Sequence, residues 1–277
     1  MRKMIVQILV ILTALYIAVC VLLYFYQEKL IFFPEQLHKD YRFRFNQPFE
    51  EINIATPDGA TLNGLLFTTG GPAKGLIFYL HGNAGSLASW GDVAPTYTAL
   101  GYDVFIADYR GYGKSEGTIS SQAQLFQDVQ TAYDTLKNRY AEKDITVLGH
   151  SIGTGLAAHL AATNQPRQLI LLAPYYSLTD MMRHKYPVVP TFILKYKLAT
   201  CQYLPHCKMP VIIFHGDKDE VIYYGSSVKL KQSFKQQDTL ITLYGQGHNG
   251  ITENPEYQTH IKRILDPFSC QVPQSPL

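Results

Sequence analysis

One serine of this 277-residue chain has the sequence setting that a nucleophilic serine needs. The segment 149–153, GHSIG, matches the pattern G-x-S-x-G. It comes directly after an apolar stretch at 145–148, and a helix-forming stretch begins at Leu156. A strand that turns sharply into a helix holds the central serine in a strained conformation with its hydroxyl exposed, and the flanking residues must be small. The glycines at both flanks meet that demand, so we predict that Ser151 is a nucleophile.

A second segment, GKSEG at 113–117, matches the same letters without the same setting. Its first glycine follows loop-forming residues rather than a strand, and the next helix-forming stretch begins only near Ser121. We therefore expect Ser115 to be a loop or capping residue.

A serine hydroxyl becomes a good nucleophile only when a base takes its proton and a buried carboxylate holds that base. In a sheet of the kind inferred below, the chain order is serine, acid, histidine. His248 lies in a glycine-rich loop at 245–250, directly after the last predicted strand, so we predict that it is the base. His260 falls in a helical stretch and is expected at the surface. The earlier histidines are expected to be hydrogen-bonded packing residues: His81, His150 and His215.

Three carboxylates compete for the role of the acid. The segment 215–221, HGDKDEV, follows a predicted strand at 211–214. We predict that Asp219 is the acid, because it precedes the apolar pair at 221–222, which should draw it inward. Asp217 is the alternative, and as a mere turn residue it would be solvated. Asp180, after the preceding strand, is a third option.

The segment HGNAG at 81–85 directly follows a predicted strand at 75–80. Its small residues allow backbone N–H groups to turn toward the carboxyl end of the sheet. We predict that the backbone amides of Asn83 and Ile152 form an oxyanion hole. The competing interpretation is a glycine-rich turn without a ligand.

No cofactor or metal ion is expected. Cys201, His206 and Cys207 are clustered, but the spacing offers no further ligands for a zinc site. Cys201 and Cys207 could instead form a disulfide in an oxidising compartment, or stay as buried free thiols.

The elements that must position these residues follow from the alternation of short apolar runs with helix-length segments. Strands are predicted at 51–55, 61–68, 75–80, 103–107, 145–148, 168–172, 211–214 and 239–243. Helices are predicted at 121–140, 152–164 and 226–235. Buried strands alternating with helices indicate an α/β fold with a mostly parallel eight-stranded sheet, covered by helices on both faces, and an antiparallel hairpin at its edge. The unusually long interval at 175–210 is predicted to be a lid.

The N-terminal stretch 4–26 carries no charge, and as a helix it is ~35 Å long, enough to cross a hydrocarbon core of ~30 Å. We predict that residues 1–26 are a transmembrane signal anchor and that residues 27–277 form the catalytic domain. The rival is a cleaved signal peptide with a weak cleavage site at 18–20, which would leave VLLYFY exposed. A short leader gives little to translocate, so we expect an inside N-terminus and an extracytoplasmic domain, periplasmic or lumenal.

Composition narrows the classes of partner. With 47% hydrophobic and 17% charged residues the chain is typical of folded proteins rather than disordered ones. A formal net charge of +2 provides no basic field for phosphate backbones, so nucleic acid is not an expected partner.

Five ordered motifs together resemble those of an α/β-hydrolase-fold serine hydrolase. They are HGNAGS (81–86), DYRGYGKSEG (108–117), GHSIGTG (149–155), HGDKDEVI (215–222) and GQGHNG (245–250). More narrowly, the chain resembles the membrane-anchored branch of α/β-hydrolase-domain proteins, in which one N-terminal helix precedes a catalytic domain with a small cap. The resemblance spans about residues 30–266. It implies Ser151 as nucleophile, Asp219 as acid, His248 as base, and the amides of Asn83 and Ile152 as oxyanion hole.

The expected function is hydrolysis of an ester or thioester through an acyl-enzyme on Ser151. The apolar stretch 188–194 of the predicted lid is bordered by cations, so a lipid-like substrate reached from anionic headgroups is one hypothesis. The other is a lid that covers the pocket and turns its lysines to water. A prolyl-oligopeptidase-like peptidase has the same triad order, although no propeller domain is present. A noncatalytic ligand receptor is a third alternative, against which the complete Ser, Asp and His argue.

Overall fold

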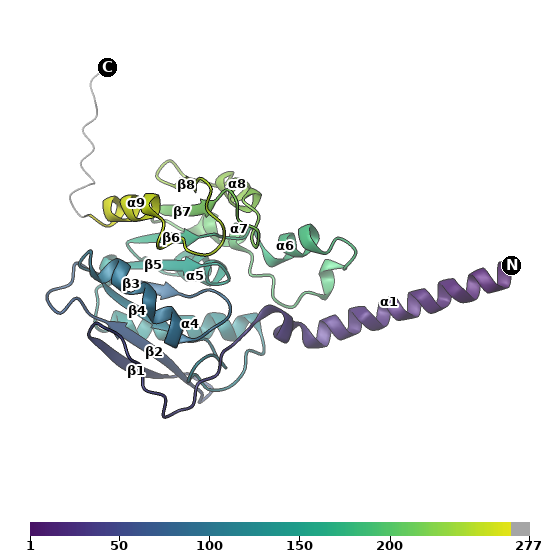
Figure 1. The fold of residues 1–277 in the computed structure, drawn as a ribbon, viewed down its shortest axis with the longest axis horizontal. Coiled ribbons are helices and arrows are strands. Elements are labelled where there is room, and N and C mark those ends of the chain that lie inside the picture. The colour runs from purple at the N-terminus through teal and green to yellow at the C-terminus, as the bar shows by residue number, and fades with distance from the viewer. Residues whose placement is uncertain (267–277) are drawn as a thin grey trace, which may run out of the picture.

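The structure is a computed structural model that describes residues 1–266. One eight-stranded sheet runs through it in the order β1-β2-β4-β3-β5-β6-β7-β8 (Figure 1). The strands are β1 (Phe49–Ala55), β2 (Thr61–Phe67), β3 (Leu76–Leu80), β4 (Asp103–Ala107), β5 (Ile145–His150), β6 (Gln168–Leu172), β7 (Val211–Gly216) and β8 (Thr239–Leu243). β2 pairs antiparallel with β1 and β4, and all other neighbours pair parallel. The predicted mostly parallel sheet with an antiparallel edge is therefore confirmed.

The central strands are apolar along their whole length because both faces of the sheet are covered. All five residues of β3 are buried. Leu76, Phe78 and Leu80 point into one hydrophobic cluster, and Ile77 and Tyr79 point into another on the opposite face. A continuous apolar run is the sequence consequence of this double burial.

The helices divide between the two faces. The first cluster contains side chains from α4 (Gln122–Lys137), α5 (Gly153–Thr163) and α8 (Gly225–Lys231), and the second from α2 (Leu87–Trp90), α3 (Pro95–Thr98) and α9 (Pro255–Leu265). Short 3₁₀ helices are η1 (Gly91–Val93), η2 (Glu142–Asp144), η3 (Thr191–Ile193) and η4 (Leu204–His206). The helix predicted at 226–235 ends earlier, at Lys231, where the Ser233 hydroxyl donates to the Leu230 carbonyl.

The N-terminal helix α1 (Arg2–Ile31) is 30 residues long and projects from the body of the molecule (Figure 1). Its length is ~45 Å. An 18-residue window within it has a mean hydropathy of 2.8 and no buried residue, so α1 could anchor the chain in a membrane. The helix runs five residues past the predicted end at Tyr26, and Gln27 in this extension is buried.

The long interval at 175–210, here called the cap segment, has little regular structure. It contains α6 (Leu178–Lys185), η3, α7 (Thr200–Tyr203) and η4. In Figure 1 α6 lies on the side of the molecule from which α1 emerges. The thiols of Cys201 and Cys207 are free rather than joined in a disulfide.

Candidate active site

Ser151 lies where β5 ends and α5 begins, as its motif predicted. Its φ angle is +52°, in the left-handed region that non-glycine residues rarely adopt. The turn is held because the Thr154 N–H and hydroxyl both donate to the Ser151 carbonyl, at 3.0 and 2.6 Å. A Cβ on Gly149 would lie 2.7 Å from the Gly153 carbonyl oxygen, and one on Gly153 would lie 2.2 Å from that of Leu80. The flanking glycines are therefore required by close backbone approach.

The structure brings Ser151, His248 and Asp219 into one line of hydrogen bonds. His248 Nε2 lies 3.0 Å from Ser151 Oγ, and His248 Nδ1 lies 2.7 Å from Asp219 Oδ2. All three residues are buried. A carboxylate can only accept, so Nδ1 carries the ring hydrogen and Nε2 is left to accept the serine proton. This is the arrangement of a nucleophile, its base and an orienting acid.

Four donors surround the carboxylate of Asp219. Oδ1 accepts from the backbone N–H groups of Val221 (2.9 Å) and Ile222 (2.8 Å), so the apolar pair that follows the acid also binds it. Oδ2 accepts from His248 and lies 3.3 Å from His215 Nε2. Burial by itself raises the pKa of the Asp219 carboxyl, but hydrogen bonds from His215 and His248 outweigh it and hold the pKa below its ordinary value. Asp219 is therefore ionised at neutral pH.

The two competing carboxylates lie elsewhere. Asp217 Oδ1 accepts the Gly245 N–H at 2.6 Å, which ties the turn after β7 to the turn after β8. Asp180 is in α6, where it accepts from Lys229 at 2.7 Å and from the Tyr223 hydroxyl. Neither makes a hydrogen bond with His248 in the described part of the chain.

His215 makes a contact with Asp219 that the sequence did not predict. Its Nε2 lies 2.9 Å from the Ile222 carbonyl and therefore carries the hydrogen, so Nδ1 accepts from the Ser227 hydroxyl at 2.6 Å. The same Nε2–H points at Asp219. His215 is thus a hydrogen-bonded packing residue, as predicted, that also supports the acid. The sequence signal was its position at the end of β7, four residues before Asp219.

The loop after β3 lies beside the serine. A Cβ placed on Gly82 would be 3.6 Å from the Ser151 Cβ, so the backbone of this loop passes close to the nucleophile. Within residues 1–266, no backbone acceptor takes the N–H of Asn83 or of Ile152. Both donors remain available for an oxygen bound next to Ser151.

The side chain of Asn83 makes a contact that the sequence did not reveal. Its Nδ2 donates to the carbonyl of Ile31, the last residue of α1, and its Oδ1 accepts from the Phe33 N–H at 3.1 Å. The Tyr112 hydroxyl donates to the same Oδ1 at 2.8 Å. The end of the N-terminal helix is therefore tied directly to the residue predicted to supply an oxyanion-hole donor.

The other serine and histidines singled out in the sequence do not belong to the line of hydrogen bonds through Ser151, His248 and Asp219. Ser115 is a buried loop residue that donates to the Asp108 carbonyl at 2.7 Å and accepts the Asn63 N–H at 2.9 Å. His260 is in α9 and partly exposed. His81 and His150 are buried, as expected of packing residues, and each has one ring nitrogen hydrogen-bonded while its Nε2 has no hydrogen-bond partner in the described residues. Burial lowers the pKa of His81 to about 4 and that of His150 to about 3, so both rings are neutral.

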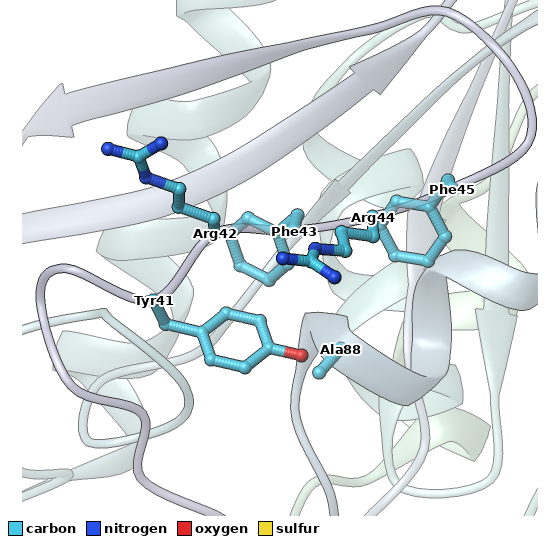
Figure 2. Close-up of a pocket in the computed structure, with 6 residues that line it drawn as sticks. All are labelled: Tyr41, Arg42, Phe43, Arg44, Phe45 and Ala88. Carbon is cyan, nitrogen blue, oxygen red and sulfur yellow. The ribbon is translucent and has the colours of Figure 1, made fainter.

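A hollow of about 480 Å³ lies elsewhere, on the connector between α1 and β1. Figure 2 shows its lining, which is Tyr41, Arg42, Phe43, Arg44, Phe45 and Ala88. Arg42 and Arg44 are exposed, whereas Phe43 is buried against the sheet. None of the three hydrogen-bonded residues of the candidate site lines this hollow.

Comparison with known proteins decides the family. Residues 71–204 match the family model Hydrolase_4, described as serine aminopeptidase, S33. Protein bem46 of Schizosaccharomyces pombe is 33% identical over 216 residues, 72% of this chain and 72% of the relative. The chain belongs to the α/β-hydrolase family. α/β-Hydrolase domain-containing protein 17B of Xenopus laevis is 29% identical over 70% of this chain and 67% of its own length.

Solved structures of the α/β-hydrolase fold agree with this membership. The esterase Pf2001 of Pyrococcus furiosus superposes with a TM-score of 0.68 at 20% identity, covering 85% of this chain and 97% of the esterase. Est1E of Butyrivibrio proteoclasticus, solved with ferulic acid, gives 0.63 at 21% identity over 79% and 98% of the two chains. The resemblance in the five motifs is confirmed as α/β-hydrolase membership, and the N-terminal helix is present.

Proposed function

We propose that this α/β-hydrolase is a serine hydrolase that cleaves an ester or thioester through an acyl-enzyme on Ser151. The observation that carries the proposal is the unbroken line of hydrogen bonds from Ser151 through His248 to Asp219. An ionised Asp219 holds His248 in the tautomer that accepts from the serine.

The geometry supports each step of acyl transfer. Ser151 Oγ attacks the carbonyl carbon of the substrate while its proton passes to His248 Nε2. The carbonyl oxygen becomes negative and accepts from the N–H groups of Asn83 and Ile152, where loss of one donor typically costs ~2.7–4 kcal/mol. When the tetrahedral intermediate collapses, His248 gives the proton to the leaving alcohol or thiol. A water molecule then repeats the sequence on the acyl-enzyme, and Ser151 regains its proton.

The proposal includes a membrane anchor at residues 1–26 and a catalytic domain that begins at residue 27, with the cap segment as its lid. Residues 267–277 of that domain lie outside the described residues. Support for an uncut anchor comes from α1, which continues through the candidate cleavage site at 18–20 without a break. The hydroxyl of Tyr16, which cleavage would remove, donates to the Val188 carbonyl in the cap segment. A lipid-like ester fits an enzyme held at a membrane.

The orientation is tested with protease while the membrane that holds α1 stays sealed and the barriers outside it have been removed. If the catalytic domain is periplasmic, protease should degrade it in such spheroplasts, and if it is lumenal, sealed organelle vesicles should protect it until they are permeabilised. Protection in spheroplasts, or degradation in sealed organelle vesicles, would place the domain in the cytoplasm.

The reaction is tested with a fluorophosphonate probe. The probe should label the intact protein and leave Ser151→Ala unlabelled, because only an activated serine displaces its leaving group. Ser115→Ala is the matched control, since Ser115 lies in the second G-x-S-x-G segment, and it should label normally. Labelling that persists in Ser151→Ala would contradict the proposed nucleophile.

A peptidase is the second candidate function, favoured by the description of the matching family model as a serine aminopeptidase. Esters, thioesters and peptide amides of graded chain length separate the two. Faster turnover of amides than of matched esters would favour the peptidase. A single slow turnover without product release would instead favour a noncatalytic ligand receptor.

A further inference from the structure

The cap segment and α1 are joined by hydrogen bonds between residues far apart in the sequence. The Tyr16 hydroxyl donates to the Val188 carbonyl at 2.9 Å. Gln27 donates through Nε2 to the Ile193 carbonyl at 3.2 Å and accepts the Lys195 N–H through Oε1 at 2.8 Å. These bonds fix residues 186–194, here called the cap loop, along one side of α1.

The cap loop exposes large apolar side chains beside this helix. Tyr186 is 64% exposed, Val188 76% and Phe192 86%. Between the loop and α1 lies an apolar groove of about 300 Å³. Its lining includes Tyr16, Cys20 and Tyr24 from α1, and Pro190, Phe192 and Ile193 from the loop. Such a continuous apolar face on a folded chain indicates a partner that is itself apolar.

The position of the cap loop along α1 identifies this partner. Residues 4–27 carry no charge, and a hydrocarbon core requires about 20 helical residues. Every run of about 20 residues within 4–27 contains residues 8–23. Tyr16 and Cys20 therefore lie in the hydrocarbon core for any placement of this helix across a membrane, and the part of the cap loop that contacts them lies at the same depth.

Most of the backbone of the cap loop has no N–H group that needs water. Pro187 and Pro190 have no N–H group to satisfy. The N–H groups of Tyr186, Val189, Ile193 and Leu194 all donate to nearby carbonyls. The carbonyls of Val188 and Ile193 accept from α1. Irregular backbone at membrane depth requires internal satisfaction of its polar groups. The cap loop meets this requirement in part, because no acceptor within residues 1–266 takes the N–H of Val188, Thr191 or Phe192.

Charged and aromatic groups mark the place where this face ends. Lys195 follows the loop, and its Nζ lies 3.1 Å from Glu28 Oε1 and 4.7 Å from the centre of the Tyr24 ring. Tyrosine and lysine are typical of the boundary between hydrocarbon and headgroups. The loop and α1 thus both change from apolar to charged surroundings at the same depth, where Lys195 lies beside Glu28.

We infer that the cap loop is embedded in the hydrocarbon of the bilayer beside α1, with lipid acyl chains in contact with Val188 and Phe192. This inference rests on the proposed anchor. An embedded cap loop also affects the candidate site. The loop directly follows α6, and α6 contacts the residues that come after Asp219. His184 in α6 stacks on Tyr223 with ring centres 4.1 Å apart, and Lys185 donates to the Glu220 carbonyl at 2.9 Å. The bilayer therefore lies on the side of the segment that carries Asp219, where a lipid-like substrate would arrive.

The experiment measures depth in the full chain reconstituted into phosphatidylcholine vesicles with brominated acyl chains, which quench tryptophan on contact. Phe192→Trp is the test, Leu12→Trp in the middle of α1 is the anchor probe, and Tyr244→Trp after β8 is the matched control. All three positions are exposed, so substitution should not disturb packing. The signal of the native Trp90 is measured in the unsubstituted chain and subtracted.

We expect Phe192→Trp to be quenched as strongly as Leu12→Trp and at least threefold more than Tyr244→Trp. If Leu12→Trp is quenched while Phe192→Trp behaves like Tyr244→Trp, the anchor stands and the embedded cap loop is wrong. If neither Leu12→Trp nor Phe192→Trp is quenched, the anchor itself fails and the inference fails with it. Fluorophosphonate labelling of Ser151 in the same samples reports the proposed reaction independently of both results.

Discussion

Two buried pairs of histidine and aspartate lie in this molecule, and they differ in charge. In the first, His248 Nδ1 and Asp219 Oδ2 are 2.7 Å apart. In the second, His81 Nε2 and Asp108 Oδ1 are 3.6 Å apart, beyond hydrogen-bond distance, and both side chains are fully buried. The same two residue types thus occur once in close contact and once apart.

The difference in charge follows from the number of donors around each carboxylate. Asp219 accepts from two backbone N–H groups and from His248, and it lies close to the N–H of His215. Asp108 accepts from one backbone N–H, that of Leu87, and burial raises its pKa to about 8. Asp219 is therefore ionised at neutral pH, while Asp108 is largely protonated. A buried aspartate next to a histidine becomes an orienting anion only where enough donors replace the lost water.

The largest effect is expected from His248→Ala, which removes the proposed base. Turnover should fall by about 10⁶-fold, as when either the serine or the histidine of a triad is lost. His260→Ala is the matched control, because His260 is partly exposed in α9 and should leave turnover within about threefold. Steady-state turnover of a short soluble ester measures both. Similar losses in the two variants would contradict the assignment of His248.

Asp219→Asn keeps the shape of the acid and removes its charge. The amide can donate to His248 Nδ1, which places the ring hydrogen on Nε2, where it can no longer accept from Ser151. Turnover should fall by about 10⁴-fold. Asp217→Asn, two residues away, should stay within about threefold. The reverse order in the same ester assay would transfer the role of the acid to Asp217.

The fold and the three hydrogen-bonded residues could be predicted because their signals are local. Strands buried on both faces must be apolar throughout, as β3 is, and a strained serine must have glycines beside it. Asp219 could be distinguished from Asp217 because an apolar pair follows it and binds its carboxylate through backbone N–H groups. Of that pair only Ile222 is buried as expected, whereas Val221 is exposed.

Other features depend on contacts between distant segments and left no pattern in the sequence. The bonds between Asn83 and the end of α1 join positions 52 residues apart. The approach of His81 to Asp108 depends on how β3 and β4 pair. The charge of Asp108 depends on how few donors reach it, since within residues 1–266 only the Leu87 N–H donates to its carboxyl group.

A smaller effect is expected from Asn83→Ala, which leaves the backbone N–H and removes the side-chain bonds to Ile31 and Phe33. If these bonds position the loop beside Ser151, kcat should fall by about tenfold with little change in KM. One or two hydrogen bonds of ~1 kcal/mol correspond to such a factor. Tyr112→Phe removes a single donor to Asn83 and should give a smaller decrease. A rise in KM at constant kcat would show that Asn83 acts on substrate binding instead.

The smallest effect concerns the second pair and appears in stability rather than turnover. The folded chain holds the Asp108 proton up to about pH 8, while the unfolded chain loses it near pH 4, so this group's contribution to stability decreases as the pH rises between those values. His81 acts oppositely, but only between about pH 4 and 6.5, where the unfolded chain takes a proton that the folded chain refuses. The free energy of unfolding should therefore decrease by roughly 1–2 kcal/mol between pH 6.5 and 8 because of Asp108, and Asp108→Asn should abolish this decrease. The melting temperature of the variant should then depend less on pH over this range. Its ester turnover should stay within about threefold of that of the unsubstituted chain. An unchanged pH profile of the melting temperature would mean that Asp108 is ionised in the folded chain, and that the two pairs do not differ in charge after all.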